Sequence, residues 1–266
     1  MSAATNRLLQ AGIQDYQSGN FTKAHQLLAE IAESGNATAE FYLGDMYATG
    51  TGVSANGRRA ARWFERSARQ GNADAQVNLG SAYASGRGVH PDIGRALKWF
   101  RCSAAQGNAL AEYNLGSAYA QGQGVVRNTA TAMRLFLKAA IHGNSYALNN
   151  LGVAYATGEG QPPNPVMAYA LFSAAIVADP GDRPAFNNRS KVLGALTPAE
   201  RGGARLLASK FVEAGHFAYA YKRARAVVVA LQAQRPRGFP ALQGRPVTPS
   251  AHTGHRLRGF SAPVVI

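Results

Sequence analysis

The sequence is poor in cysteine and has no long apolar run. Its 266 residues include one cysteine, Cys102, which excludes an internal disulfide framework and favours a reducing compartment. No stretch approaches the roughly 20 apolar residues of a membrane helix, and the first residues lack the pattern of a secretory signal. We therefore expect a cytoplasmic protein, with Cys102 as a buried and unreactive thiol.

Acidic residues are scarce, and they are scarcest in the last third of the chain. Lysine and arginine number 28 against 14 aspartates and glutamates, which gives a formal net charge of +14. Residues 1–182 contribute +2 of this charge and residues 183–266 contribute +12. A basic segment beside a nearly neutral body indicates an anionic contact or a solvated tail. The candidate anion-binding residues are Arg201, Arg205, Lys222, Arg223, Arg225, Arg235 and Arg237.

A 36-residue period runs through most of the chain. A leucine followed by glycine recurs at Leu43, Leu79, Leu115 and Leu151. A tyrosine and a phenylalanine recur at the same interval, at Tyr47, Tyr83, Tyr119 and Tyr155 and at Phe64, Phe100, Phe136 and Phe172. Gly-x-Gly pairs also recur, and they begin at Gly50, Gly86, Gly122 and Gly158. Self-similarity at a fixed period of this length indicates a solenoid, in which each unit buries its apolar side against its neighbours.

Each unit has the pattern of two antiparallel helices, A and B. In the first unit, Ala39, Leu43 and Tyr47 form one apolar stripe at four-residue spacing. We expect helix A to begin after each Gly-Asn pair and helix B after Asn56 and its equivalents, because asparagine caps the unpaired amides of a first turn. The Gly-x-Gly pairs are expected in the turn between the helices, where positive φ is needed.

The repeated pattern resembles a known family. The segments Ala-x-x-x-Leu-Gly-x-x-Tyr, Gly-x-Gly-Val and Ala-x-x-Trp-Phe are similar to the Sel-one-like repeat, a relative of the tetratricopeptide repeat; the fourth unit departs from the pattern at Gln161 and Leu171. The resemblance implies a right-handed all-α solenoid of antiparallel helix pairs. We expect an N-terminal tetratricopeptide-like cap in residues 1–35, four repeats in 36–179, capping helices in 180–233 and a disordered basic tail in 234–266.

We expect the side of helix A opposite the apolar stripe to stay outside the packing between repeats and to bind a partner. We call it the helix-A face, and the resemblance implies that it lines the concave groove of the solenoid. Its candidate partner-binding residues are Tyr42, Asp45, Asp74, Asn78, Ser81, Leu110, Asn114, Ser117, Tyr146, Asn150 and Asn188. An asparagine amide both donates and accepts, so this column can hold the backbone of an extended segment or bond a neighbouring helix. Helix B carries a basic stripe, typical of a solvated face, at Arg58, Arg62, Arg66, Arg69, Arg95, Lys98 and Arg101.

No catalytic or metal-binding constellation emerges. The Gly-x-Gly turns follow no strand and precede no Gly-Lys-Ser/Thr, so they do not form a phosphate loop. His252 and His255 have no further ligand nearby in the sequence. We expect neither enzyme, cofactor nor metal, but an adaptor or regulator that binds a protein or peptide on the helix-A face. The alternative is binding of nucleic acid or an anionic surface by the basic C-terminal third. Repeats of the family that the chain resembles are found in scaffolds of protein quality control and bacterial signalling, and the resemblance implies a role of that kind.

Overall fold

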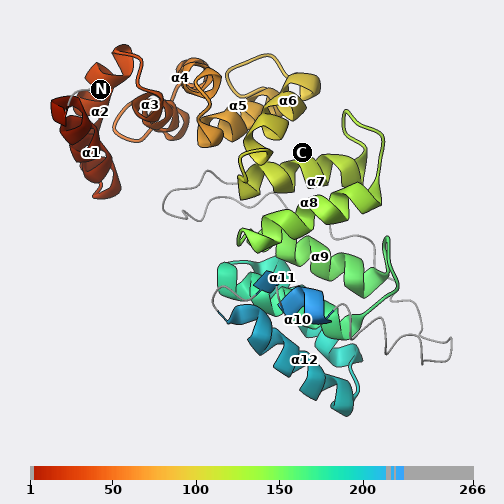
Figure 1. Ribbon diagram of the computed structural model, residues 1–266. Helices are drawn as coiled ribbons and strands as arrows, with labels where there is room; N and C mark the ends of the chain where they lie inside the picture. Colours follow the sequence, from red (N-terminus) through yellow and green to blue (C-terminus); the bar gives the residue numbers. More distant parts are fainter. Residues whose placement is uncertain (1–2, 214–216, 219, 225–266) are drawn as a thin grey trace. The chain divides into compact units, whose positions relative to one another are not determined.

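In a computed structural model of the protein, residues 3–213, 217–218 and 220–224 are described. They form helices and no strand (Figure 1). The helices are α1 (Ala3–Gln17), α2 (Phe21–Glu33), α3 (Ala37–Thr49), α4 (Gly57–Arg69), α5 (Ala73–Ser85), α6 (Ile93–Ala104), α7 (Ala109–Gln121), α8 (Thr129–Ile141), α9 (Ser145–Thr157), α10 (Pro165–Ala178), α11 (Arg183–Ala195) and α12 (Pro198–Val212). The predicted tail in 234–266 lies outside the described residues, as do Arg225, Arg235 and Arg237.

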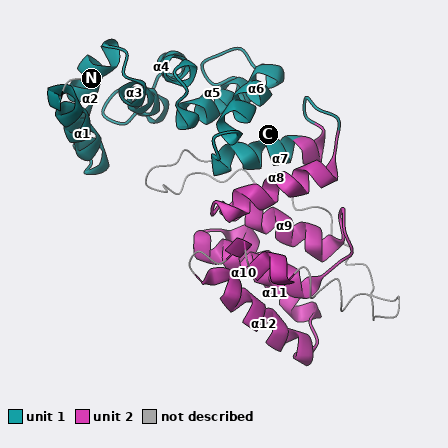
Figure 2. Cartoon of the chain, in the orientation of Figure 1, with its two compact units in different colours: residues 1–118, 123–126, 256–266 teal, residues 119–122, 127–255 magenta. Residues whose placement is uncertain are grey.

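The chain divides into two compact units (Figure 2). Of the described residues, unit 1 contains those up to residue 118 together with 123–126, and unit 2 contains 119–122 and those from 127 onward. Consecutive helices pack in pairs: α1 on α2, α3 on α4 and α5 on α6 in unit 1, and α9 on α10 in unit 2. The predicted all-α fold of antiparallel helix pairs is therefore confirmed, whereas the division into caps and repeats stays a prediction. None of the helices in the described ranges combines the length and apolar character that a bilayer span requires.

Side chains of asparagine and aspartate begin the helices where the sequence predicts. Asn36 Oδ1 accepts a hydrogen bond from the Ala39 amide at 2.9 Å at the start of α3, and Asn56 Oδ1 accepts from the Arg59 amide at 3.0 Å at the start of α4. Their equivalents form the same bond: Asn72, Asp92, Asn108, Asn128, Asn144 and Asn164. Each cap satisfies an amide that the first turn leaves unpaired, which fixes the start of both helices in each repeat.

In the first, second and fourth repeats, the glycine after the recurring leucine lets helix B approach helix A closely. A Cβ atom on Gly44 would lie 2.6 Å from the Phe64 ring, and one on Gly152 would lie 2.5 Å from the Phe172 ring. The neighbouring Leu43 is 1% exposed and fills the core. The leucine therefore supplies apolar contact, while the glycine leaves room for the phenylalanine of helix B.

The two glycines of each Gly-x-Gly turn have different roles. Gly50 ends α3 with φ 75°, and its amide donates to the Met46 carbonyl at 2.9 Å. Gly88 packs against the preceding repeat, because a Cβ atom there would lie 2.0 Å from the carbonyl oxygen of Gly57 at the start of α4. Both glycines of all four turns have positive φ, as predicted. The turn thus reverses the chain and also joins one repeat to the one before it.

A buried carboxylate connects the helices of the first repeat. Glu40 is 1% exposed, and it accepts hydrogen bonds from Arg66 Nε at 2.8 Å and from Gln70 Nε2 at 2.7 Å. Arg66 also donates to the Ala32 carbonyl at 3.0 Å and lies over the Trp63 ring, 4.6 Å from its centroid. Arg66 is therefore a structural residue and not only part of a solvated stripe.

Cys102 is exposed on α6, so the prediction of a buried thiol is wrong. The buried side of this helix is formed by Leu97, Phe100 and Ser103. Cys102 follows Phe100 by two residues, which places it about 200° around the helix and away from the core. The repeat pattern alone does not show that Cys102 faces outward whereas Ser103, the next residue, is buried.

Helix α10 in unit 2 is buried along most of its length. Nine of its 14 residues are buried, and the helix packs against α9, α11 and α12. Leu148 and Ala174 stand in the fourth repeat where the first repeat has Glu40 and Arg66. The fourth repeat therefore joins its helices through apolar contact at the place where the first uses a charge pair.

Candidate partner-binding surface

The helix-A face of unit 1 combines a tyrosine ring with two carboxylates. Tyr42 is half-buried, and its ring centroid lies 5.1 Å from that of Tyr16, whose hydroxyl donates to Asp45. Burial raises the pKa of Tyr42, and the negative charges of Asp74 and Asp45 raise it further. The exposed Asp74 accepts a hydrogen bond from Asn108 Nδ2 at 2.9 Å. We call Tyr42, Asp45 and Asp74 the Tyr42 site.

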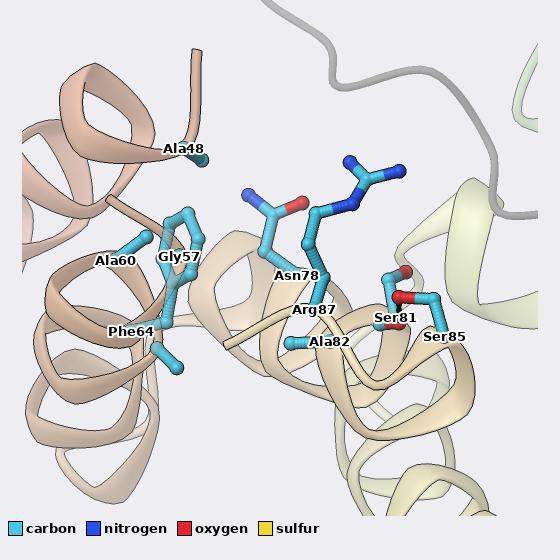
Figure 3. A pocket seen from close by; sticks show the side chains of 10 residues that line it. Ala48, Gly57, Ala60, Phe64, Asn78, Ser81, Ala82, Ser85 and Arg87 are labelled. Carbon is cyan, nitrogen blue, oxygen red and sulfur yellow. Dashed lines mark hydrogen bonds between the residues drawn. The ribbon is translucent and has the colours of Figure 1, made fainter. Parts of the chain in front are cut away.

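A pocket opens on the same face of unit 1, beside α5 (Figure 3). Its cavity volume is about 60 Å³, and it is lined by Ala48, Gly57, Ala60, Ala61, Phe64, Asn78, Ser81, Ala82, Ser85 and Arg87. Asn78 and Ser81 come from the predicted set, and Ser85 continues the helix-A face one turn further. The side chains of Asn78 and Arg87 extend in the same direction, with the Phe64 ring on the α4 side (Figure 3). This volume is enough for a few water molecules or a small side chain.

The predicted residues on α7 lie deeper than their equivalents. Asn114 is 0% exposed, and neither its Nδ2 nor its Oδ1 has a hydrogen-bond partner. Ser117 is also buried, whereas the equivalent residues on α5, Asn78 and Ser81, are half-buried. Leu110 is half-buried in the first turn of the helix. Asn114 is therefore enclosed in this structure, whereas Asn78 is partly accessible, and its role in binding a partner stays a prediction.

In unit 2 the predicted residues have a mixture of environments. Tyr146 is half-buried, and burial raises its pKa, with a further contribution from the charges of Asp179 and Asp182. Asn150 is half-buried. Asn188 is buried and donates from Nδ2 to Asn149 Oδ1 at 3.1 Å, which joins α11 to α9. This bond matches the second alternative for the asparagine column, in which the amide bonds a neighbouring helix.

The basic residues of the C-terminal third are only partly within the described ranges. Arg201, Arg205, Lys222 and Arg223 are exposed, and Arg201 Nε donates to the Leu196 carbonyl at 3.2 Å. The nearby aromatic rings pack on one another: the ring centroids of Phe211 and Phe217 are 5.2 Å apart, and those of Phe217 and Tyr221 are 5.8 Å apart. These aromatic rings therefore pack on one another as a cluster.

Three residues near these sites were missed by the sequence analysis. Arg87 lies in the turn after α5, while Asp179 and Asp182 lie in the connection between α10 and α11. Helical periodicity assigns faces only within helices, so it carries no information on side chains in turns. Among the described residues, no group of three or more histidine, cysteine, aspartate or glutamate residues could hold a metal ion.

The stacked helix pairs define an α-solenoid, a class of repeat protein that binds partners along an extended face. Residues 37–72, 73–108, 109–144 and 145–176 match the Sel1 repeat. The chain belongs to the Sel1 repeat family, as the resemblance predicted. Proteins of this family are generally protein-interaction modules.

Solved structures show the same fold. The protective antigen c5321 of uropathogenic Escherichia coli is 32% identical with a TM-score of 0.68; the match covers 84% of this chain and 46% of c5321, so the chain spans less than half of that protein. A Sel1 repeat protein from Oxalobacter formigenes is 25% identical with a TM-score of 0.66, over 82% of this chain and 99% of that one. The immunity protein Pa5087 of Pseudomonas aeruginosa shares the fold at 17% identity, with a TM-score of 0.51 over 94% of this chain and 90% of its own. No curated protein matches the chain.

Proposed function

We propose that the chain is a non-enzymatic adaptor or regulator that binds a segment of a partner protein along the helix-A face. The observation that carries this proposal is the position of the pocket. Asn78, Ser81 and Ser85 line it, and all three come from the predicted helix-A face of α5. A hollow that combines polar side chains with an apolar lining and an aromatic ring suits a peptide segment.

The chemistry of the pocket supports recognition of both backbone and side chain. Asn78 offers a donor and an acceptor that match a peptide group, and Ser81 offers a hydroxyl, while the Ser85 hydroxyl donates to the Ser81 carbonyl at 2.8 Å and can still accept a hydrogen bond. Arg87 is exposed and forms no ion pair within the described part of the chain, so its guanidinium is available to a carbonyl or a carboxylate. The apolar floor of Ala60 and Phe64 can take a small apolar side chain of the partner.

Affinity capture with paired variants tests the proposal. We expect Asn78→Lys combined with Ser81→Lys to weaken partner capture by about tenfold or more, because two long cations fill and charge the pocket. The matched control is Arg62→Glu with Lys98→Glu, which changes exposed residues of helix B and should leave capture intact. Circular dichroism checks that helicity is unchanged in both. Full capture by the pocket variant would reject the helix-A face as the binding surface.

Nuclease treatment and a salt series in the capture experiment test whether the basic C-terminal third binds nucleic acid. Binding through phosphate contacts loses affinity steeply with salt, with a log–log slope of about −0.9 per contact on duplex DNA. We expect capture to survive nuclease and to vary weakly with salt. Loss of capture after nuclease treatment would favour the nucleic-acid alternative instead.

A further inference from the structure

The pocket of unit 1 combines an apolar wall with polar groups on the opposite wall (Figure 3). Ala60 and Phe64 of α4 form the apolar wall. Asn78 and Ser81 of α5, together with Arg87 of the turn that follows, line the other side. A side chain that fits both walls has aliphatic carbons that end in a polar or charged group. The charge of the pocket determines which group that is.

Arg87 gives the pocket a positive charge that no carboxylate of the described residues balances. The one carboxylate of α4, Glu65, accepts a hydrogen bond from Arg69 Nη2 at 2.6 Å. The one carboxylate of α5, Asp74, accepts a hydrogen bond from Asn108 Nδ2 at 2.9 Å. Neither helix therefore supplies a counter-ion to the guanidinium of Arg87, which is free to form charge-assisted hydrogen bonds with an anion from outside.

The surroundings of Arg87 add to the positive potential of the pocket. Gly57, the first residue of α4, lines the pocket, and a Cβ atom on it would lie 3.5 Å from the carbonyl carbon of Arg87. The turn that carries Arg87 therefore packs on the positive end of the α4 dipole. Helix α4 also contains five arginines against one glutamate. These charges favour an anion over a neutral or cationic group beside Arg87.

We propose that the pocket binds the side chain of an acidic residue, glutamate or aspartate, in the partner segment. The carboxylate pairs with the guanidinium of Arg87 and accepts hydrogen bonds from the Asn78 amide and the Ser81 hydroxyl. The carbons of the acidic side chain lie against Ala60 and Phe64. A cavity of about 60 Å³ has room for a carboxylate and the carbons next to it. This inference rests on the proposed use of the helix-A face and names the chemistry that the face selects.

Degenerate heptapeptide pools test this preference on the full-length chain. Both ends of each peptide are blocked, the central position is fixed as glutamate or glutamine, and the other positions are uncharged. Retention on the immobilised protein is measured at about 0.15 M salt, which screens exposed charges more than about 8 Å away. We expect the glutamate pool to be retained about fivefold more than the glutamine pool, because hydrogen bonds between charged groups are stronger than those of a neutral amide.

Two pocket variants and a matched control locate the preference. Arg87→Gln removes the cation and should lower the preference for the glutamate pool to less than about twofold. Asn78→Asp places a carboxylate in the pocket at nearly constant side-chain shape and should also remove the preference. Arg101→Gln removes one exposed cation from α6 of the same unit and should leave the preference intact. Equal retention of the two pools by the native chain, or a preference that Arg87→Gln leaves unchanged, would overturn the proposal.

A third pool separates an acidic side chain from the end of a peptide chain. It has glutamine at the centre and a free C-terminal carboxylate, and we expect it to be retained no better than the blocked glutamine pool. Retention equal to that of the glutamate pool would assign the pocket to a chain terminus and contradict the proposal.

The double variant Asn78→Lys with Ser81→Lys distinguishes failure of this inference from failure of the proposed function. Equal retention of the glutamate and glutamine pools that this variant abolishes would reject the acidic preference and leave the helix-A face as the proposed binding surface. Pools that the native chain and this variant retain alike would reject both.

Discussion

The first and fourth repeats have the same helix pair but differ in what joins the two helices. In the first repeat, Glu40 is buried and bonded to Arg66 and Gln70. In the fourth, Leu148 and Ala174 occupy the positions of Glu40 and Arg66, and α10 is surrounded by α9, α11 and α12. The geometry of the repeat is therefore set by the shared Leu-Gly and phenylalanine columns, while the interface chemistry at other positions is exchangeable.

Burial of α10 disfavours a charged side chain at the position that Arg66 has in the first repeat. A charged side chain on a helix that is enclosed on several sides has no route to water, and an unpaired buried charge is strongly unfavourable. Helix α4 keeps a solvent-exposed side, where Arg66 retains 43% exposure of its side chain while reaching Glu40. The first repeat can thus use a charge pair at a lower desolvation cost.

The largest difference between the repeats is expected from truncating the phenylalanine of helix B. Phe172→Ala should lower the free energy of unfolding by about 4–5 kcal/mol, because Phe172 is 1% exposed and its loss leaves an enclosed cavity. Phe64→Ala should cost about 3 kcal/mol, since Phe64 borders the existing pocket and its space can open to water. Urea unfolding with hydrogen exchange of α3, α4, α9 and α10 measures both. Equal losses of unfolding free energy in the two variants would show that the neighbouring pocket does not lower the cost of the cavity at Phe64.

A smaller effect is expected from moving the interface of the fourth repeat into the first. Arg66→Ala alone should destabilise the protein by about 2–3 kcal/mol, because Glu40 is left buried with a single remaining donor. Glu40→Leu with Arg66→Ala copies the fourth repeat and should cost less than about 1 kcal/mol. Chemical denaturation of the two single variants and the double variant gives the coupling energy. A double variant as unstable as Arg66→Ala would mean that the charge pair is required for this packing.

Most of the fold follows from the sequence because it repeats. A column that returns every 36 residues, such as Leu43 and its equivalents, fixes both helix phase and burial, and the asparagine caps fix the helix starts. The features that the sequence does not predict depend on differences between equivalent positions of the repeats. The burial of Asn114 and the bond of Asn188 to Asn149 arise from neighbours that periodicity does not specify.

The sequence predicts the proposed binding surface as a face but not as a site. Helical phase placed Asn78 and Ser81 on one side of α5, and the structure adds a pocket between them and α4. The residues that complete it, Arg87 and Gly57, come from a turn and from the start of the next helix. Their convergence depends on the packing of the Gly88 turn on Gly57, a three-dimensional contact that no single repeat contains.

Site-specific photo-crosslinking tests most directly whether the helix-A face is the working surface. A photoreactive amino acid at Ser81 reports on this face, and one at Lys98 reports on helix B of the same repeat. We predict that a captured partner crosslinks from position 81 and not from position 98. Crosslinking from position 98 alone would contradict the account.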